Sequence, residues 1–287
     1  MKIIFFGAGY CSKYIIKNLS KKTEIICTHN QEIKKESFDS KFNLKRLKLS
    51  DFIKKKNIYL ENTTHILNSI PPNKNGDLIL QKVTKKELKK LPSLVWLGYF
   101  SSTSVYGNHD GKWVDELSLT NPTTSRGSLR LNAELQYLEL LKNNIPIHIF
   151  RLPGIYGLGR SQFEKIKSKN YFAVKKNNHF FSRIHVEDIA NAITKSFKNP
   201  TPGEIFNITD DYPCESLKPL KFACKLMKIK LPEIIEINDQ RVNQMTKSFY
   251  LDNKRVSNKK IKKILNWTPK YRNYKLGLKK IFENLQK

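Results

Sequence analysis

Hydroxyl side chains gather in the middle of the sequence, where residues 101–104 (SSTS) follow an apolar run and precede a Tyr-Gly turn. The run is expected to be a buried strand, and hydroxyls at the carboxyl end of such a strand lie where open α/β sheets place their chemistry. Ser102 is the candidate catalytic hydroxyl. Tyr106, in the turn, is a second candidate, as a proton donor. Tyr156 and His109, in adjoining loops, are further candidates, although each of the three rings is more often structural than catalytic.

Two arginines, Arg126 and Arg130, lie at the start of the helix expected after this stretch. Arginine stays protonated near neutral pH, so neither side chain can act as an acid or a base. Five of the nine arginines lie between residues 126 and 183, although the other basic residues are lysines. Because a guanidinium suits bidentate contact with carboxylate or phosphate, we hypothesise that Arg126, Arg160 and Arg183 contact an anionic substrate or effector. Alternatively, Arg151 and Arg183 form internal ion pairs, and Arg130 contacts only a cofactor.

A glycine loop follows the first predicted strand, residues 2–6 (KIIFF), and precedes a predicted helix. Strand, glycine turn and helix in this order predict a dinucleotide site. Gly7 would allow the tight turn, and Gly9 would let a pyrophosphate approach the backbone at the helix N-terminus. Ser12, a small residue, replaces the third glycine of the motif. Tyr10 and Cys11, within the loop, are expected to contact the cofactor.

The second predicted strand ends at Thr28-His29-Asn30, where an NAD site usually carries Asp or Glu for the ribose 2′-hydroxyl. These residues, with Lys34 and Lys35 nearby, suit a 2′-phosphate better, so NADP is the preferred cofactor and NAD the alternative. Residues 69–71 (Ser69, Ile70, Pro71) are expected to border the adenosine half, unless they only stop a strand. Arg130 and the pair Leu152-Pro153 complete the expected cofactor contacts.

Strands and helices are expected to alternate along most of the chain. Strands are expected at 24–27, 44–47, 64–69, 94–101, 145–151 and 203–208, and helices at 51–56, 78–90 and 217–228, near 258–265 and near 274–285. Leu131, Leu135, Leu138 and Leu141 predict one buried helix face, and Ile189, Ile193 and Phe197 predict another. An extended piece is expected near 234–237, and residues 160–178 are expected to be irregular and mobile.

The predicted fold class is α/β: a Rossmann-type doubly wound parallel sheet with a small, mostly helical C-terminal substrate or cap region. The dinucleotide-binding core is expected over residues 1–155, completed by about 184–208. The cap is expected over about 156–183 and 209–287.

The composition disfavours nucleic-acid-binding, metal-binding, disulfide-rich and membrane-spanning classes of protein. The 53 basic and 25 acidic residues give a formal net charge of +28, but the lysines are scattered, which favours a solvated surface over a specific nucleic-acid site. Four cysteines and six histidines show no metal-binding or disulfide spacing. No apolar run approaches the length of a membrane span. We therefore expect a soluble cytoplasmic protein without a metal or membrane partner, and a homodimer is left open.

Several motifs resemble the NAD(P)-dependent epimerase/dehydratase family, the extended branch of the short-chain dehydrogenase/reductase superfamily. They are GAGYCS, SSTSVYG, RLPGIYG, RIHVEDIANAI and GEIFNITDD, and the closing KRVSNKKIKKILNWTPKY also looks like the family's C-terminal segment. The resemblance runs nearly end to end and implies oxidoreductase or epimerase chemistry.

The same resemblance implies an atypical active site. The family uses a Ser or Thr four positions before the Tyr of the V-Y-G turn, and Ser102 fills that position. It also uses a Tyr-x-x-x-Lys pair, in which the Tyr moves a proton and the Lys lowers the pKa of that Tyr and holds the nicotinamide ribose. Here these two positions are Arg126 and Arg130, so the usual proton transfer does not carry over.

Three functions follow as alternatives. The first is an NADP(H)-dependent enzyme that acts on a small anionic or sugar-like substrate through Ser102 and another proton donor. The second is a non-catalytic NADP(H)-binding sensor or scaffold, which the loss of the Tyr-Lys pair favours. The third, a polyanion-binding protein, rests on net charge alone.

Overall fold

A seven-stranded sheet organises the first of two units into which the chain divides. Unit 1 comprises Met1–Ser102, Leu129–Arg151 and Ile189–Phe206, and unit 2 comprises Thr103–Ser128, Leu152–Asp188 and Asn207–Lys287. The structure is a computed structural model that describes residues 1–30, 39–168 and 171–286.

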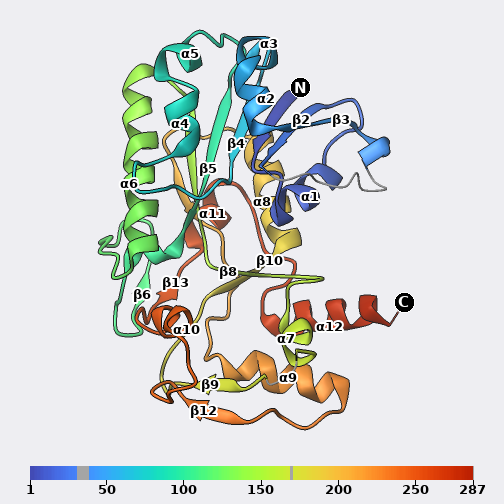
Figure 1. Cartoon of the computed structure of the whole chain (residues 1–287), viewed down its shortest axis with the longest axis vertical. Helices are drawn as coiled ribbons and strands as arrows, with labels where there is room; N and C mark the ends of the chain where they lie inside the picture. Colours follow the sequence, from blue (N-terminus) through green and yellow to red (C-terminus); the bar gives the residue numbers. More distant parts are fainter. Residues whose placement is uncertain (31–38, 169–170, 287) are drawn as a thin grey trace. The chain divides into compact units, whose positions relative to one another are not determined.

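The sheet has the strand order β11-β7-β5-β4-β1-β2-β3, of which Figure 1 labels β5, β4, β2 and β3. β1 pairs in parallel with both β2 and β4, β2 pairs in parallel with β3, and β4 does so with β5. The order reverses between β1 and β4, and in such sheets the ligand crevice lies at the carboxyl ends of the strands beside the reversal. The strand bounds are β1 Lys2–Phe6, β2 Glu24–His29, β3 Asn43–Lys48, β4 His65–Asn68, β5 Trp96–Ser102, β7 Ile147–Leu152 and β11 Ile205–Asn207.

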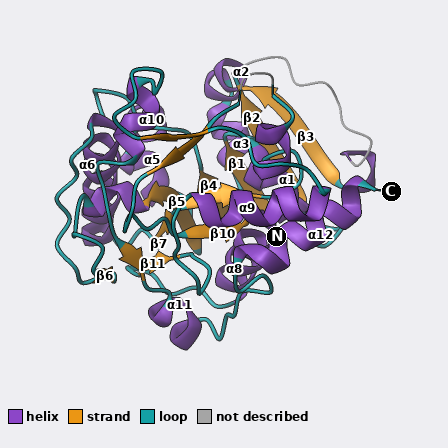
Figure 2. Cartoon of the chain, turned by 90° about the horizontal axis from the view of Figure 1, so that it is seen from below, coloured by secondary structure: helices purple, strands orange, loops and turns teal. Residues whose placement is uncertain are grey.

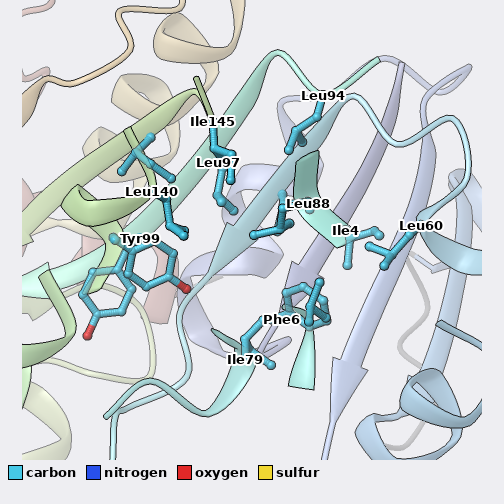
Figure 3. Packing of buried hydrophobic residues seen from close by; sticks show 14 of the residues in the cluster. Ile4, Phe6, Leu60, Ile79, Leu88, Leu94, Leu97, Tyr99, Leu140 and Ile145 are labelled. Atoms are coloured by element: carbon cyan, nitrogen blue, oxygen red, sulfur yellow. The ribbon is translucent and has the colours of Figure 1, made fainter. Parts of the chain in front are cut away.

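One face of this sheet packs against a row of helices through a continuous apolar cluster (Figure 3). Ile4 and Phe6 of β1 point to this face, because alternate residues of a strand share a face. Their partners include Phe52, Leu60 and Tyr137 from the covering helices. These helices are α2 Leu49–Lys54, α3 Lys56–Leu60, α4 Leu78–Lys82, α5 Lys85–Lys89 and α6 Ser125–Glu139.

The opposite face is covered by α8 (Val186–Lys198), with α1 (Tyr10–Lys17) following β1. Trp96 of β5 donates its indole N–H to Ser196 Oγ of α8 at 2.9 Å, and the Trp96 and Phe197 rings meet edge to face at 4.6 Å. Because both faces are covered, β1, β2, β4, β5 and β7 are buried on both sides and lack the polar alternation of a half-exposed strand, whereas the edge strand β3 keeps that alternation. The Rossmann-type doubly wound α/β fold predicted from the sequence is confirmed.

Two expectations for the helices of unit 1 were wrong, the second of them in part. The helix predicted over residues 78–90 is two short helices, because Thr84 starts a new one with a reciprocal capping box to Glu87. On α6 Ala133 and Tyr137 are buried, whereas Leu135 is 57% exposed. Of the four predicted leucines, Leu138 and Leu141 pack against the apolar cluster, and Ala133 and Tyr137 fill the contact in place of Leu135.

Unit 2 contains three two-stranded parallel pairs and five helices within the described residues. The pairs are β8 (Gly154–Tyr156) with β10 (Arg183–His185), β9 (Ala173–Lys175) with β12 (Ile234–Glu236), and β6 (Trp113–Val114) with β13 (Arg255–Val256). The helices are α7 Gln162–Ile166, α9 Leu217–Met227, α10 Gln244–Phe249, α11 Lys259–Ile264 and α12 Tyr274–Leu285. Helices α9 and α12 pack together (Figure 2).

Residues 160–178, expected to be irregular, contain α7 and β9. Three short 3-10 helices span Asp39–Lys41, Thr103–Tyr106 and Leu140–Asn143. Among the described helices, none combines the length and the apolar composition needed to cross a membrane.

A buried ion pair joins α6 to β7 inside unit 1. Glu134 and Arg151 are 1% and 4% exposed, and the Arg151 guanidinium donates to both Glu134 carboxylate oxygens at 2.8 to 3.2 Å. Ser101 Oγ of β5 donates to Glu134 Oε1 at 2.5 Å. The carboxylate therefore holds one helix and two strands together, close to their carboxyl-end residues Ser101 and Arg151.

Replacing Glu134 with Gln should leave the Arg151 charge buried without its counter-charge and lower the free energy of unfolding by about 3–5 kcal/mol. Urea denaturation would measure this loss. The matched control is Glu139→Gln on the same helix, because Glu139 pairs with Lys142 in solvent and exposed pairs contribute about 0–1 kcal/mol. Equal, small effects of both variants would contradict the role given to Glu134.

Candidate functional site

The turn after β1 is shaped by a close approach to the end of β4. Gly7 has φ +87°, in the left-handed region that favours glycine. A Cβ at Gly7 would lie 2.7 Å from Ser69 Oγ and 3.1 Å from Ile70 Cγ1. Both the backbone conformation and this contact therefore require glycine at position 7.

Gly9 differs from Gly7, because nothing in the described protein requires a glycine there. Its φ of −92° is open to any residue, and a Cβ at this position would meet no atom within 4 Å. Gly9 is the N-cap of α1, whose first turn carries no acidic residue. The open space thus lies at a helix N-terminus, where exposed N–H groups and the helix dipole attract anions.

Two serine hydroxyls fix the carbonyl of Gly7. Ser12 Oγ donates to it at 3.1 Å and Ser69 Oγ donates at 2.8 Å. Ser12, the residue in place of the third glycine, is buried and closes the loop onto the first turn of α1. Ile70 N–H donates to Asn68 Oδ1 at 3.0 Å, and Pro71 is exposed. The structure therefore brings Ser69 and Ile70 against the glycine loop.

The end of β2 also contacts this loop. Thr28 is fully buried, and its carbonyl accepts from Ala8 N–H at 2.8 Å. His29 is half-buried and Asn30 is exposed. Tyr10 and Cys11, in the first turn of α1, are half-buried. The predicted contacts at 7–11, 28–30 and 69–71 therefore come together around the carboxyl ends of three neighbouring strands.

A cation that sequence reasoning missed lies on the adjacent strand. Arg46 of β3 pairs with Cys27 in the register of the sheet and binds both carboxylate oxygens of Asp39, at 2.7 and 2.8 Å. Burial raises the pKa of the Cys27 thiol to about 12, so this thiol stays protonated. Lys34 and Lys35, which favoured NADP, lie outside the described residues. Arg46 could have been found from the sequence, because it lies within the strand expected at residues 44–47.

Arg130 is held against the end of β5. Its Nη1 donates to the Phe100 carbonyl at 2.6 Å and to Tyr99 Oη at 3.1 Å. Burial, opposed by the Arg130 charge, raises the pKa of Tyr99 to about 12, so its hydroxyl stays protonated. Ser102, the last residue of β5, is half-buried. Arg130 and Ser102 thus belong to the same strand end, as the sequence predicted, and Tyr99 is an additional contact that it did not indicate.

The alternative proton donors lie in unit 2, where Tyr106 and His109 are hydrogen-bonded and the buried Tyr156 hydroxyl has no hydrogen-bond partner among the described residues. Tyr106 is fully buried, and its hydroxyl donates to Asn207 Oδ1 at 2.8 Å. His109 Nε2 lies 3.1 Å from the Tyr106 carbonyl. Burial, followed by the charge of Asp210, raises the pKa of Tyr156 well above its usual range. A catalytic role for Tyr106 stays a prediction that requires its bond to Asn207 to break.

The three candidate substrate arginines of unit 2 have different surroundings. Arg126 is exposed, and its Nη2 donates to Ser248 Oγ at 2.9 Å. Arg183 is half-buried, and its Nη1 donates to the Phe181 and Cys214 carbonyls at 2.9 and 3.2 Å. Arg160 is exposed.

The charges of Arg160 and Arg183 both act on one lysine. Lys165 has its pKa lowered by desolvation and then by the charges of Arg183 and Arg160. Leu152, at the end of β7, is buried and Pro153 is half-buried.

A buried carboxyl lies beside Arg183. Asp210 is 1% exposed, its N–H donates to the Arg183 carbonyl at 2.7 Å, and its Oδ1 accepts from Tyr212 N–H at 3.0 Å. Burial raises the pKa of Asp210 to about 8, against the lowering by Tyr212 N–H and Arg183. This carboxyl is protonated at neutral pH. Within the described residues no group of three or more His, Cys, Asp or Glu side chains could hold a metal ion.

The raised pKa of Asp210 predicts a stability cost that grows with pH. Between about pH 4 and pH 8 the unfolded chain loses this proton while the folded chain keeps it, so the free energy of unfolding falls as pH rises. Asp210→Asn removes this linkage. Its melting temperature should exceed that of the wild type by a margin that widens from pH 5 to pH 8.

Thermal melts at pH 5, 6, 7 and 8 would measure that margin. Asp51→Asn, an exposed position on α2, is the control and should show a margin that does not change with pH. A constant margin for Asp210→Asn would contradict a protonated Asp210.

Solved structures share this architecture. A conserved protein of unknown function from Silicibacter pomeroyi DSS superposes with a TM-score of 0.91 and 34% identity, over 99% of this chain and 98% of that one. dTDP-glucose 4,6-dehydratase from Bacillus anthracis str. Ames, in complex with NAD, gives a TM-score of 0.78 at 17% identity, over 100% and 96%. UDP-glucuronic acid 4-epimerase from Bacillus cereus, also with NAD, gives 0.75 at 17%, over the full length of both. The last two are similar in fold.

Among curated proteins, Protein YeeZ of Escherichia coli (strain K12) is 33% identical over 122 residues. That match spans 42% of this chain and 40% of the length of YeeZ. No protein-family profile matches the chain.

Proposed function

The chain belongs to the same family as the conserved Silicibacter pomeroyi protein, and we propose that it binds a nicotinamide dinucleotide at the carboxyl edge of β1, β2 and β4. One observation carries this proposal. Gly9 is a glycine that neither packing nor backbone conformation requires, and the space that a side chain would fill lies at the N-terminus of α1. A pyrophosphate in that space would accept hydrogen bonds from the first turn of the helix.

The surroundings of the loop support the same ligand. Gly7 and the hydroxyls of Ser12 and Ser69 hold the loop in one conformation, so it is preformed for binding. The site lies where the strand order reverses, and the structurally similar dehydratase and epimerase were solved with NAD. When bound, the nicotinamide would supply or accept a hydride.

We assign NADP(H) as the preferred form. Thr28, His29 and Asn30 offer no carboxylate that would repel a 2′-phosphate. Arg46, on the neighbouring strand, adds a positive charge, although it is bound to Asp39.

The reaction we propose is of the oxidoreductase or epimerase type on a small anionic or sugar-like substrate. Ser102 would position a substrate oxygen at the end of β5. Arg130, already fixed by the Phe100 carbonyl, would hold cofactor or substrate oxygens through its remaining N–H groups. Arg126 cannot take up a proton, so another group must transfer it.

A non-catalytic sensor is the second candidate. It is favoured by the two arginines at the Tyr and Lys positions, together with the buried and bonded state of the Tyr106 hydroxyl. Such a protein would bind the dinucleotide and exchange no hydride. Incubating the protein with 4R- and 4S-deuterated NADPH and pooled metabolites separates the two functions, because deuterium transfer to a metabolite occurs only in the enzyme.

Dinucleotide binding should weaken when Gly9 is replaced by Val. The side chain would fill the space at the start of α1 and weaken NADPH binding at least about tenfold, or about 1.4 kcal/mol. Because a Cβ meets nothing in the described protein, the melting temperature should hardly change. Titration of NADPH fluorescence measures the affinity, and Gly9→Ala should lie between the wild type and Val.

The same titration tests the cofactor preference, which predicts tighter binding of NADPH than of NADH. Equal NADPH affinity of the wild type and Gly9→Val would reject the proposed site. No binding of either dinucleotide at millimolar concentration would reject the function.

A further inference from the structure

We propose that Arg126, Ser248 and Phe249 form a recognition site in unit 2 for the carboxylate of a small ligand with an apolar or aromatic body. The inference rests on the proposed function in one respect, since this ligand would be the substrate or effector that accompanies the dinucleotide. It names the chemistry of that ligand and gives helix α10 of unit 2 a part in binding it.

Arg126 is held by two residues of α10, Ser248 and Phe249. Its Nη2 donates to Ser248 Oγ at 2.9 Å, and the centre of its guanidinium lies 4.6 Å from the centroid of the Phe249 ring. Ser248 Oγ in turn donates to the Met245 carbonyl at 2.7 Å, so the hydroxyl is oriented to accept from Arg126. Ser248 thus fixes one edge of the planar guanidinium, and the Phe249 ring fixes one of its faces.

The positive charge of Arg126 has no carboxylate partner among the described residues. Among the described residues, no carboxylate lies within 4.0 Å of the Arg126 guanidinium. The hydrogen bond to Ser248 uses Nη2, and no described residue accepts from Nε or Nη1. The carboxylate nearest α10 along the chain, Asp252, is already bound to Lys254 at 3.2 Å and to Thr123. A fixed guanidinium with open donors is suited to an oxyanion from outside the chain.

Exposed apolar side chains lie beside this cation. Met245 and Phe249 are 66% and 53% exposed, and four residues apart they lie on one side of α10. Leu251, just after the helix, is 54% exposed, and α10 has no buried residue. Large apolar side chains grouped at a surface mark ligand sites. A ring on Met245 and Phe249 would place an attached carboxylate at Arg126.

The base from which Arg126 projects is rigid. Gly127, the next residue, is packed so closely that a Cβ would lie 2.8 Å from both Pro122 Cβ and the Ser104 carbonyl oxygen. Its N–H donates to Thr124 Oγ1 at 3.1 Å. The start of α6 is therefore fixed in unit 2. α10 (Figure 1), which has no buried residue, is the part able to adjust to a ligand.

Binding of 4-fluorobenzoate, observed by ¹⁹F NMR line broadening, tests the proposal, with 4-fluorobenzamide and fluoroacetate as matched probes. The wild type should bind 4-fluorobenzoate at least about fivefold more tightly than either, because only this probe carries both the charge and the ring. Arg126→Gln should weaken 4-fluorobenzoate binding about tenfold, to the level of the amide. Arg126→Lys should lie between, and Phe249→Ala should weaken both aromatic probes about threefold or more.

The control is Arg272→Gln, which removes an equally exposed arginine elsewhere in unit 2 and should leave all three affinities unchanged. Equal binding of the acid and the amide, or unchanged binding by Arg126→Gln, would overturn the proposal. Unchanged binding with a lowered melting temperature would make Arg126 a structural contact only. A dimer that dissociates in Phe249→Ala, without probe binding by the wild type, would assign the surface to a second copy of the chain.

NADPH affinity is measured on the same samples. NADPH binding without 4-fluorobenzoate binding would reject this site and leave the proposed function intact. 4-Fluorobenzoate binding without NADPH binding would reject the function and leave the site.

Discussion

The contact between the turn after β1 and the end of β4 is the constraint on which the rest of unit 1 depends. Only a hydrogen atom fits between Gly7 and Ser69, and the carbonyl of Gly7 accepts both the Ser69 and the Ser12 hydroxyls. The turn, the strand end and the first turn of α1 are therefore one rigid element. This element lies at the reversal of strand order, so the helix N-terminus and the open space at Gly9 are at the edge where such sheets bind ligands.

Helix α6 carries charged residues that are bound at the end of β5. Arg130 and Glu134 lie one turn apart on it, the first bound to the Phe100 carbonyl and the second to Ser101 and Arg151. Arg130 is thus built into the end of β5. Arg126 is bound by α10 instead. The two arginines place permanent cations at the end of β5 and beside α10.

Much of the fold could be predicted from the sequence because most strands of unit 1 are short apolar runs bounded by glycine, proline or polar residues. The glycine loop was predictable because its conformation depends on neighbouring residues. Burial of α6 was predicted only in part, because Ala133 and Tyr137 fill the contact in place of Leu135. The partners of Arg126 lie about 120 residues away along the chain, and the burial that raises the pKa of Asp210 depends on the tertiary structure. Neither leaves a trace in a single sequence.

Binding of a dinucleotide by the loop around Gly9 can be tested by amide chemical shifts recorded during an NADPH titration. The largest saturable changes should occur at residues 7–12, 28–30 and 69–70, which surround the space at the start of α1. Saturable changes confined to other parts of the chain, or no change at millimolar NADPH, would contradict it.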